Sequence, residues 1–240
     1  MTVTSPRPPW SAIVLAGGTA QRLGGVDKAS IEVSGGTLLD HLIGTLPDTV
    51  PIVVAGPSRP TVRAVTFRVE DPAGSGPVAA ISAALVAIST PMVAVVAVDI
   101  PWAAPVVLRL VAELSDTHNA DAIIPIDAQG RRQLLCSVWH STALAAALDR
   151  LGDPRGRSVR ALVDGAVVLE RPLSLDEAVM LADIDTPQDL ARERRRLGRP
   201  TLVHRPRTGS VSTGEEDVPW TNGPQLSSGS SAWICRSTST

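Results

Sequence analysis

The sequence predicts a doubly wound α/β domain with a mostly parallel sheet, because short apolar segments alternate with segments of helical periodicity. The apolar segments cover residues 11–15, 52–55, 65–69, 92–98, 122–126, 134–139 and 166–169. Strands that are apolar along their whole length are typical of a parallel sheet that is covered on both faces. Ligands of such sheets bind beyond the carboxyl ends of the strands, so the loops that follow strands are where we expect functional residues.

Helical periodicity marks four further segments, which are residues 77–88, 105–114, 141–151 and 187–197. Pro105 is acceptable in the first turn of its helix, because the N–H that it lacks would have no partner there. Thr186 is the predicted N-cap of the last helix. Asp189 lies in the first turn of that helix, where a carboxylate suits the helix dipole.

The chain of 240 residues is long enough for one sizeable α/β domain, which we assign to residues 11–199. Residues 1–10 form an N-terminal extension that is rich in Thr and Pro and lacks the apolar stretch of a secretory signal. From residue 201 to residue 240 about half of the residues are Ser, Thr, Gly or Pro, and no periodicity remains. Such a segment cannot bury enough apolar surface to offset its ordering entropy, so residues 200–240 are predicted to be a disordered tail.

The charge balance argues against two classes of partner. The formal net charge is −2 and the pI is near 6.1, so we expect neither a nucleic acid nor a membrane as partner. The longest apolar run, residues 92–98, is too short to span a bilayer. Cys136 and Cys235 lie far apart and form neither a disulfide framework nor a zinc spacing. A reduced, cytoplasmic setting is therefore the expectation.

The strongest functional signal is residues 15–28, which read LAGGTAQRLGGVDK and begin where the first strand ends. Gly17 and Gly18 let backbone amides approach a ligand without an intervening side chain, and successive amides form an anion-binding concavity. Arg22 can grip a phosphate with two parallel hydrogen bonds, and Lys28 supplies a point charge. The spacing is neither that of a Walker loop nor that of a dinucleotide fingerprint. The segment is interpreted as a polyphosphate cradle.

Acidic residues follow two other predicted strands. Asp99 ends the strand at residues 92–98, and an acid in that position is costly unless it is hydrogen-bonded or bound to a metal. Residues 71–81, DPAGSGPVAAI, form a Gly/Pro loop that leads into a helix and begins with Asp71. Residues 182–190, ADIDTPQDL, contain Asp185 directly before the predicted N-cap. Asp185 could bind a metal, or it could simply help to start the helix.

A fifth segment, residues 130–139, reads GRRQLLCSVW. Arg131, Arg132 and Gln133 could meet a phosphate or a polar ring edge of a substrate, or they could be solvated loop residues. Cys136 lies in an apolar run, where a cysteine is expected to be a core residue and not a nucleophile.

These five segments together resemble the motifs of the molybdenum cofactor guanylyltransferases, in order and at similar spacing over about residues 11–197. The family's first motif reads LAGGxSxRxGxDK. This chain has two residues, Gly25 and Val26, where most members have one, and Ala20 where Ser is more common. Asp71, Gly76 and Pro77 match the family's DxxxGxGPLAGI, and Asp185 stands at the second Asn of NINTPEDL.

The resemblance implies a Rossmann-like nucleotidyltransferase fold and Mg²⁺-dependent transfer of GMP from GTP to molybdopterin or the molybdenum cofactor, with release of pyrophosphate. It places Mg²⁺ on Asp99 and Asp185, gives catalytic roles to Arg22, Lys28 and Asp99, and puts the pterin-bearing substrate beside residues 130–139. Transient contact with molybdoenzyme maturation proteins is implied as well. The resemblance implies that the nucleotide binds to Leu15, Ala16, Gly17, Gly18, Lys28, Asp71 and Asp99.

Three other functions remain compatible with the sequence. They are a CTP-dependent cytidylyltransferase for the same cofactor, a nucleotidyltransferase for a sugar or alcohol phosphate, and a non-catalytic nucleotide-binding protein. Relatives that transfer GMP carry LAGG at residues 15–18, whereas those that transfer CMP more often carry LAAG. Gly17 leaves space that the methyl group of an alanine would fill, which favours the larger purine and hence GTP. Retention of Lys28 and Asp99 argues against a protein that only binds nucleotide.

Overall fold

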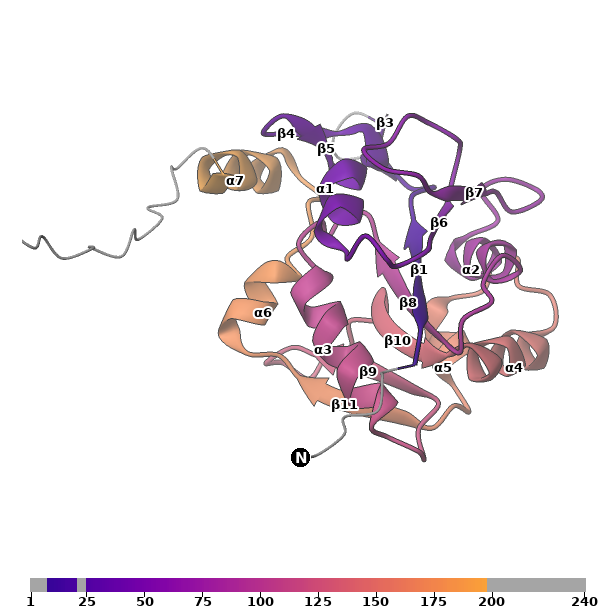
Figure 1. Ribbon diagram of the computed structural model, residues 1–240. Coiled ribbons are helices and arrows are strands. Elements are labelled where there is room, and N and C mark those ends of the chain that lie inside the picture. The colour runs from indigo at the N-terminus through magenta and orange to yellow at the C-terminus, as the bar shows by residue number, and fades with distance from the viewer. Residues whose placement is uncertain (1–7, 21–24, 198–240) are drawn as a thin grey trace, which may run out of the picture. The chain divides into compact units, whose positions relative to one another are not determined.

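In the computed structural model, residues 8–20 and 25–197 are described. They form a sheet with helices on both faces (Figure 1). The predicted tail, residues 200–240, and the predicted catalytic residue Arg22 lie outside the described residues. Of the predicted N-terminal extension, Pro8 and Pro9 are described, and Trp10 already belongs to the first strand.

The main sheet has seven strands in the order β11-β9-β10-β8-β1-β6-β7. β10 runs antiparallel to β8 and β9, and the other neighbours are parallel, as a mostly parallel sheet requires. Leu15 of β1 is paired with Ala97 of β8, so the loops that follow these two strands emerge side by side. The strands are β1 (Trp10–Leu15), β6 (Ile52–Ala55), β7 (Thr66–Arg68), β8 (Met92–Ala97), β9 (Ala122–Ile126), β10 (Cys136–His140) and β11 (Val168–Pro172).

The two faces of the sheet bury separate apolar clusters, because alternate residues of each strand point to opposite sides. Along β1, Ala12 and Val14 pack with residues of α1 and α3, whereas Ile13 packs with residues of α2, α4 and α5. Figure 1 shows these two groups of helices on opposite sides of the sheet. The helices are α1 (Leu38–Thr45), α2 (Pro77–Leu85), α3 (Ala104–Ser115), α4 (Ser141–Leu151), α5 (Val159–Val163), α6 (Leu175–Met180) and α7 (Pro187–Leu197).

The predicted bounds of β6, β9, α4 and α7 are those observed, whereas other ends differ by a few residues. Helix 77–88 ends at Leu85, and strand 134–139 begins only at Cys136, because Leu134 and Leu135 form a turn. Three helices, α1, α5 and α6, are absent from the sequence-based assignment. For α1 a signal was available, since Thr37 and Asp40 form a capping box ahead of buried apolar residues at helical spacing.

Short elements near the first strand complete the described part of the chain. β2 (Thr19–Ala20) pairs with β3 (Val26–Asp27), so the glycine-rich segment folds back on itself as a hairpin. A 3-10 turn, η2 (Lys28–Ser30), follows directly, and β4 (Glu32–Val33) pairs with β5 (Gly36–Thr37) before α1.

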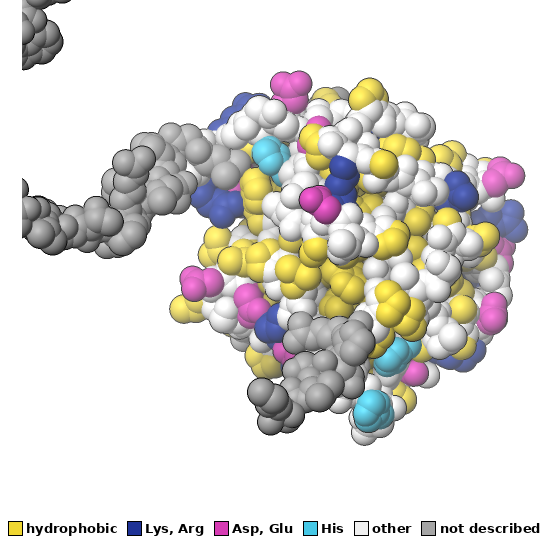
Figure 2. Space-filling view, in the orientation of Figure 1, with side chains coloured by type: hydrophobic (Ala, Val, Ile, Leu, Met, Phe, Trp, Pro, Cys, Tyr) yellow, Lys and Arg dark blue, Asp and Glu magenta, His cyan; other side chains and the backbone are white. Residues whose placement is uncertain are grey.

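Exposed apolar side chains include Leu108 on α3 and Leu175 and Val179 on α6. On the face drawn in Figure 2, apolar side chains gather over these two helices. Leu108 also lines a hollow to which Trp102 and Met180 contribute.

The loop after β6 approaches the loop after β1 so closely that any side chain at residue 56 would be crowded against it. A Cβ on Gly56 would lie 3.0 Å from the carbonyl carbon and 3.1 Å from the carbonyl oxygen of Ala16. Both positions are backbone, which cannot rotate away. The polyphosphate cradle predicted from the sequence therefore depends on this contact with the neighbouring loop.

Gly56→Ala is expected to lower the free energy of unfolding by about 1–3 kcal/mol, because the new methyl group must displace the backbone of Ala16. Gly44→Ala is the control with the opposite sign. Gly44 lies in helix α1, and a Cβ on it would meet nothing closer than 3.9 Å. Replacing a helical glycine by alanine stabilises the folded protein by about 0.5–1 kcal/mol. Thermal unfolding of both variants measures these changes in stability. A Gly56→Ala protein as stable as the parent would contradict the close contact.

Candidate active site

The candidate site lies at the carboxyl ends of the two central strands, β1 and β8. Leu15 ends β1 and is followed by Gly17 and Gly18, and Asp99 follows β8. The backbone N–H of Val98 donates to the carbonyl of Leu15 over 3.1 Å, which joins the two loops where they leave the sheet. The site is thus in the position where open α/β sheets bind ligands.

Lys28 is the last residue of the segment 15–28, which we call the glycine loop, and it lies close to the start of that loop. The N–H of Lys28 donates to the carbonyl of Gly18 at 3.3 Å, so the two arms of the β2–β3 hairpin meet at the point where the loop leaves β1. A Cβ on Gly18 would meet nothing within 4 Å, and one on Gly17 would meet only the carbonyl oxygen of Ala55 at 3.9 Å. Packing against the described residues therefore demands glycine at neither position, and the bare backbone leaves room for a ligand.

The ammonium group of Lys28 bridges two carboxylates. Its Nζ lies 2.8 Å from Oδ2 of Asp99 and also donates to Oδ1 of Asp185. The three side chains are largely covered, with exposed fractions of 17% for Lys28, 21% for Asp99 and 34% for Asp185. The structure thus brings together three residues that the sequence assigned to one site.

Burial alone lowers the pKa of Lys28, but the hydrogen bonds that Lys28 donates to Asp185 and Asp99, together with their negative charges, outweigh it and raise the pKa. Lys28 is therefore cationic at neutral pH. Burial also raises the pKa of Asp183, and the charges of Asp185 and Asp99 add to that effect. The cluster of Lys28 with Asp99, Asp183 and Asp185, which we call the centre, therefore contains three acids and one cation. Its net charge is negative.

The loop that carries Asp183 and Asp185 is anchored on both sides. The N–H of Ile184, between the two acids, donates to the carbonyl of Asp99 over 3.0 Å. On the other side Thr186 caps helix α7 as predicted, since its Oγ1 accepts from the N–H of Asp189 at 3.2 Å. Further along α7, the buried carboxylate of Glu193 accepts from Nε1 of Trp102 at 3.0 Å. Asp185 is therefore held against Asp99 by the fold itself.

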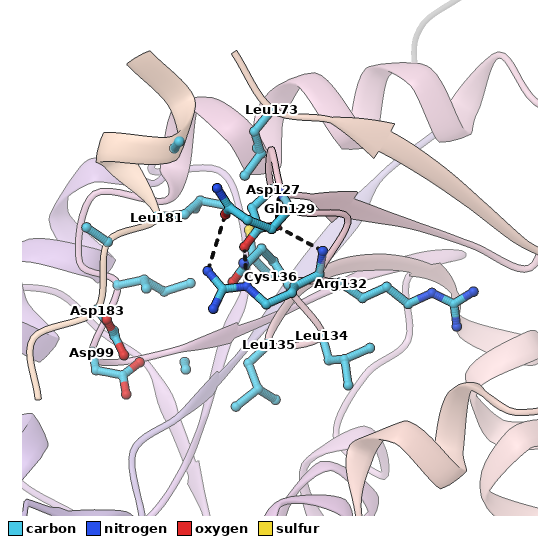
Figure 3. A pocket seen from close by; sticks show the side chains of 16 residues that line it. Asp99, Asp127, Gln129, Arg132, Leu134, Leu135, Cys136, Leu173, Leu181 and Asp183 are labelled. Carbon is cyan, nitrogen blue, oxygen red and sulfur yellow. Dashed lines mark hydrogen bonds and ion pairs between the residues drawn. The ribbon is translucent and has the colours of Figure 1, made fainter. Parts of the chain in front are cut away.

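Two cavities flank this centre. The glycine cavity, of about 240 Å³, is lined by Leu15, Gly17, Gly18, Lys28 and Asp99 and by residues of the β7–α2 loop. The arginine cavity, of about 590 Å³, is lined by Asp99 and Asp183 at one end and by residues 129–136 at the other, as Figure 3 shows. Ala97, Asp99 and Leu135 line both cavities, so Asp99 stands at their junction.

A tight turn fixes one wall of the arginine cavity. Oδ1 of Asp127 accepts from the backbone N–H groups of Gln129 and Arg131, both at 2.9 Å, and Oδ2 accepts from Nε of Arg131 at 2.7 Å. The backbone N–H of Arg131 is the main reason that the pKa of Asp127 lies below its usual value. Arg132 pairs with Glu170 of β11 over 2.7 Å. Both arginines therefore have carboxylate partners while they line the cavity.

Cys136 also lines the arginine cavity, but only 1% of its surface is exposed. Burial raises the pKa of its thiol to about 12, so the thiol is neutral at physiological pH. This agrees with the expectation of a core residue.

The β7–α2 loop presents a different acid from the one that the sequence favoured. Asp71 is exposed, whereas its neighbour Glu70 lines the glycine cavity. Oε1 of Glu70 accepts from the N–H of Gly74 at 2.9 Å, which closes the loop. The family motif at residues 71–81 begins with Asp71 and gives no information on the residue before it. Glu70 could therefore not be predicted from the motif. Ala16, also named from the motif, is buried, and its N–H donates to the carbonyl of Ala55.

One sequence signal at this site was overlooked. The chain contains 22 Lys and Arg residues, and Lys28 is the only lysine among them. A compact ammonium group can sit between two carboxylates where a planar guanidinium cannot do so equally well. The single lysine of the chain thus stands at a place where its compact ammonium group pairs with two carboxylates.

Within the described ranges, no three His, Cys, Asp or Glu residues form a group that could hold a metal on its own. In the same ranges no helix is both long and apolar enough to cross a membrane.

Comparison with known proteins identifies the family of this chain. The family described as MobA-like NTP transferase domain matches residues 12–170. A probable molybdenum cofactor guanylyltransferase from Mycolicibacterium paratuberculosis is 35% identical over 189 residues, which cover 75% of this chain and 92% of that protein. A probable molybdenum cofactor guanylyltransferase from Natronomonas pharaonis is 28% identical over 199 residues, with coverage of 78% and 98%.

Solved structures show the same fold. Molybdopterin-guanine dinucleotide biosynthesis protein A from Archaeoglobus fulgidus has a TM-score of 0.62 at 23% identity, and the match covers 78% of this chain and 97% of that chain. The 2-C-methyl-D-erythritol 4-phosphate cytidylyltransferase from Thermus thermophilus has a TM-score of 0.57 at 20% identity, with coverage of 78% and 97%. The Rossmann-like nucleotidyltransferase fold is thereby confirmed. The chain belongs to the MobA-like NTP transferase family and is a nucleotidyltransferase.

Proposed function

We propose that this enzyme transfers GMP from GTP to molybdopterin or the molybdenum cofactor and releases pyrophosphate. The observation that carries the proposal is that Asp99, which pairs with Lys28, stands at the junction of two cavities, because a group-transfer enzyme must hold donor and acceptor on either side of one reacting centre. The guanylyltransferase names of the relatives supply the donor and the acceptor.

The glycine cavity is the proposed nucleotide side. Bare backbone at Gly17 and Gly18 offers amide donors to the triphosphate, and Lys28 supplies a cation at the same edge. Glu70 and Asp71 stand near the proposed nucleoside end, where a carboxylate can accept hydrogen bonds from ribose or base. Arg22 is proposed to bind the triphosphate, and the motif at residues 15–28 supports this role.

The arginine cavity is the proposed acceptor side. Its volume of about 590 Å³ lies in the range of small-molecule sites, and Arg131 and Arg132 suit an anionic acceptor. In the proposed reaction a phosphate oxygen of molybdopterin attacks the α-phosphate of GTP in line, and pyrophosphate leaves on the nucleotide side. Lys28 balances the charge that builds up on the transferring phosphoryl group. The reaction needs no covalent enzyme intermediate.

Mg²⁺ is the proposed cofactor, and the residues present fit it. Asp99 and Asp185 offer the carboxylate oxygens that Mg²⁺ prefers, and Mg²⁺ is commonly held by one or two carboxylates together with substrate phosphates. When bound, Mg²⁺ would neutralise part of the triphosphate charge. In nucleotide-free protein the ammonium of Lys28 already pairs with both carboxylates and occupies the oxygens that would hold the metal, so we expect the metal to bind together with the nucleotide.

A cytoplasmic location and transient contact with molybdoenzyme maturation proteins belong to the same proposal. They follow from the proposed product, which must reach enzymes that use it.

A competition assay tests the proposal. Enzyme, Mg²⁺ and molybdopterin are mixed with equal GTP and CTP, each labelled at the α-phosphate, and transfer to the acceptor is measured. We expect GMP transfer to predominate, although the space left by one methyl group at residue 17 contributes only about 1–3 kcal/mol of discrimination. Predominant CMP transfer would refute the guanine assignment and keep the enzyme class. Transfer to a sugar phosphate and none to molybdopterin would refute the acceptor.

Asp99→Asn is expected to reduce turnover by on the order of 100-fold or more, because one charged contact to the reacting centre is lost. Asp185→Asn is expected to be mild, since relatives carry Asn at the matching position of their motif. Steady-state kinetics of both variants at saturating Mg²⁺ provide the comparison. Equal losses, or an unimpaired Asp99→Asn enzyme, would overturn the proposed metal position.

Lys28→Met is expected to strengthen the binding of Mn²⁺ to nucleotide-free protein by about tenfold or more, because the removed ammonium pairs with both carboxylates and offsets part of their negative charge. GTP binding to the same variant should weaken. Mn²⁺ binding is followed by electron paramagnetic resonance, with Asp99→Asn in the Lys28→Met background as the control that removes the gain. Unchanged or weaker Mn²⁺ binding in Lys28→Met would show that the two carboxylates do not form the metal site.

A further inference from the structure

Arg59 lies in the loop after β6 and reaches the turn that carries Lys28. Its NH1 group donates to Oδ2 of Asp27 and, over 2.9 Å, to Oγ of Ser30. Its Nε donates to the carbonyl of Pro57 at 3.2 Å, which fixes the side chain to its own loop. Only 15% of the Arg59 side chain is exposed. These contacts make Arg59 a link between two loops that the chain itself does not join.

Asp27 is the residue through which this link acts. Its Oδ1 accepts from the N–H of Ala29 at 3.0 Å and so caps the turn η2, in which Lys28 is the first residue. Its Oδ2 accepts from Oγ of Ser30 at 3.1 Å. Asp27 is also paired with Thr19 in the hairpin of the glycine loop. One residue therefore ends the hairpin through its backbone and caps the turn through its carboxylate.

Charge adds a second reason for the cation. The carboxylate of Asp27 stands one residue from Lys28, at a site proposed to receive a triphosphate. Without a partner this carboxylate would compete for the Lys28 ammonium and repel phosphate groups. Arg59 is the only cation that pairs with Asp27 among the residues described.

We propose that Arg59 is a positioning residue, which holds Asp27 and thereby sets Lys28 where the nucleotide phosphates bind. Arg59 acts through Asp27 and does not itself touch the phosphates. The inference rests on the proposed function, because it needs a nucleotide in the glycine cavity.

Arg63 provides a matched control from the same part of the chain. Its side chain is 17% exposed and donates to the carbonyl oxygens of Leu46, Pro47 and Val50 at 2.9–3.2 Å and to Asp48. Like Arg59 it is largely covered and donates several hydrogen bonds, but all of its described partners lie in the segment after α1 and none of them in residues 15–30. Loss of Arg63 should affect stability alone.

The test compares Arg59→Met, Arg59→Lys and Arg63→Met by calorimetric titration with GTP and Mg²⁺, together with Tm, KM and kcat. Arg59→Met is expected to weaken GTP binding and raise KM by about tenfold or more, whereas Arg63→Met lowers Tm and leaves GTP affinity within about twofold. Arg59→Lys should recover part of the loss, since an ammonium can still pair with Asp27. Because Lys28 is the only lysine, the ¹³Cε signal of lysine-labelled protein should shift in Arg59→Met and not in Arg63→Met.

A double-mutant cycle with Asp27→Asn separates indirect from direct action. Arg59→Met should lose most of its effect in the Asp27→Asn background. An undiminished effect there, or equal losses of GTP affinity in Arg59→Met and Arg63→Met, would overturn the positioning role while the proposed function stands. A parent enzyme that binds no GTP would overturn both. If Arg59→Met does not fold, Arg59→Lys against Arg63→Lys gives the same comparison, and equal affinities would refute the role.

Discussion

The ion pairs of Lys28 with Asp99 and Asp185 join segments that are 71 and 157 residues apart in the sequence. Each partner arrives by its own route: Lys28 on a hairpin and turn, Asp99 at the end of a fully buried strand, and Asp185 ahead of a capped helix. A removed partner would leave an uncompensated charge in a largely covered place, which is costly. The geometry of the site and the packing of the three segments are therefore coupled.

Under the proposed function the site has two electrostatic states. Without nucleotide, Lys28 offsets part of the negative charge of Asp99, Asp183 and Asp185, and the cluster stays net negative. With nucleotide, the proposed triphosphate would offer Lys28 new anionic partners, and the carboxylates would become available to a divalent cation. The position of Asp99 at the junction of both cavities would link this exchange to the proposed acceptor side. The loops around the site are held by hydrogen bonds, which limit how far they can adjust. These bonds involve Asp127, Thr186 and Arg59.

Much of the fold could be predicted from the sequence, because fully apolar strands and amphipathic helices carry strong periodic signals. The strands and helices that follow such patterns, such as β6 and α4, were found with their ends. Helix α6 has no fully buried residue, so no apolar face indicated it. The antiparallel direction of β10 depends on how a loop folds back and left no mark in the strand itself. The cluster of Lys28, Asp99 and Asp185 was assembled by motif resemblance, whereas Glu70, Asp183 and Arg59 became visible only through contacts across loops.

The central claim is that Lys28 leaves its carboxylates for the phosphates of a nucleotide, and the single lysine allows this to be measured directly. Protein labelled with ¹³C-lysine should give one side-chain ¹³Cε signal from Lys28. The signal is expected to shift on addition of a non-hydrolysable GTP analogue with Mg²⁺, and the shift should be absent when the analogue is replaced by guanosine, which has no phosphates. A signal that stays in place with the bound analogue, or that moves equally with guanosine, would contradict the account.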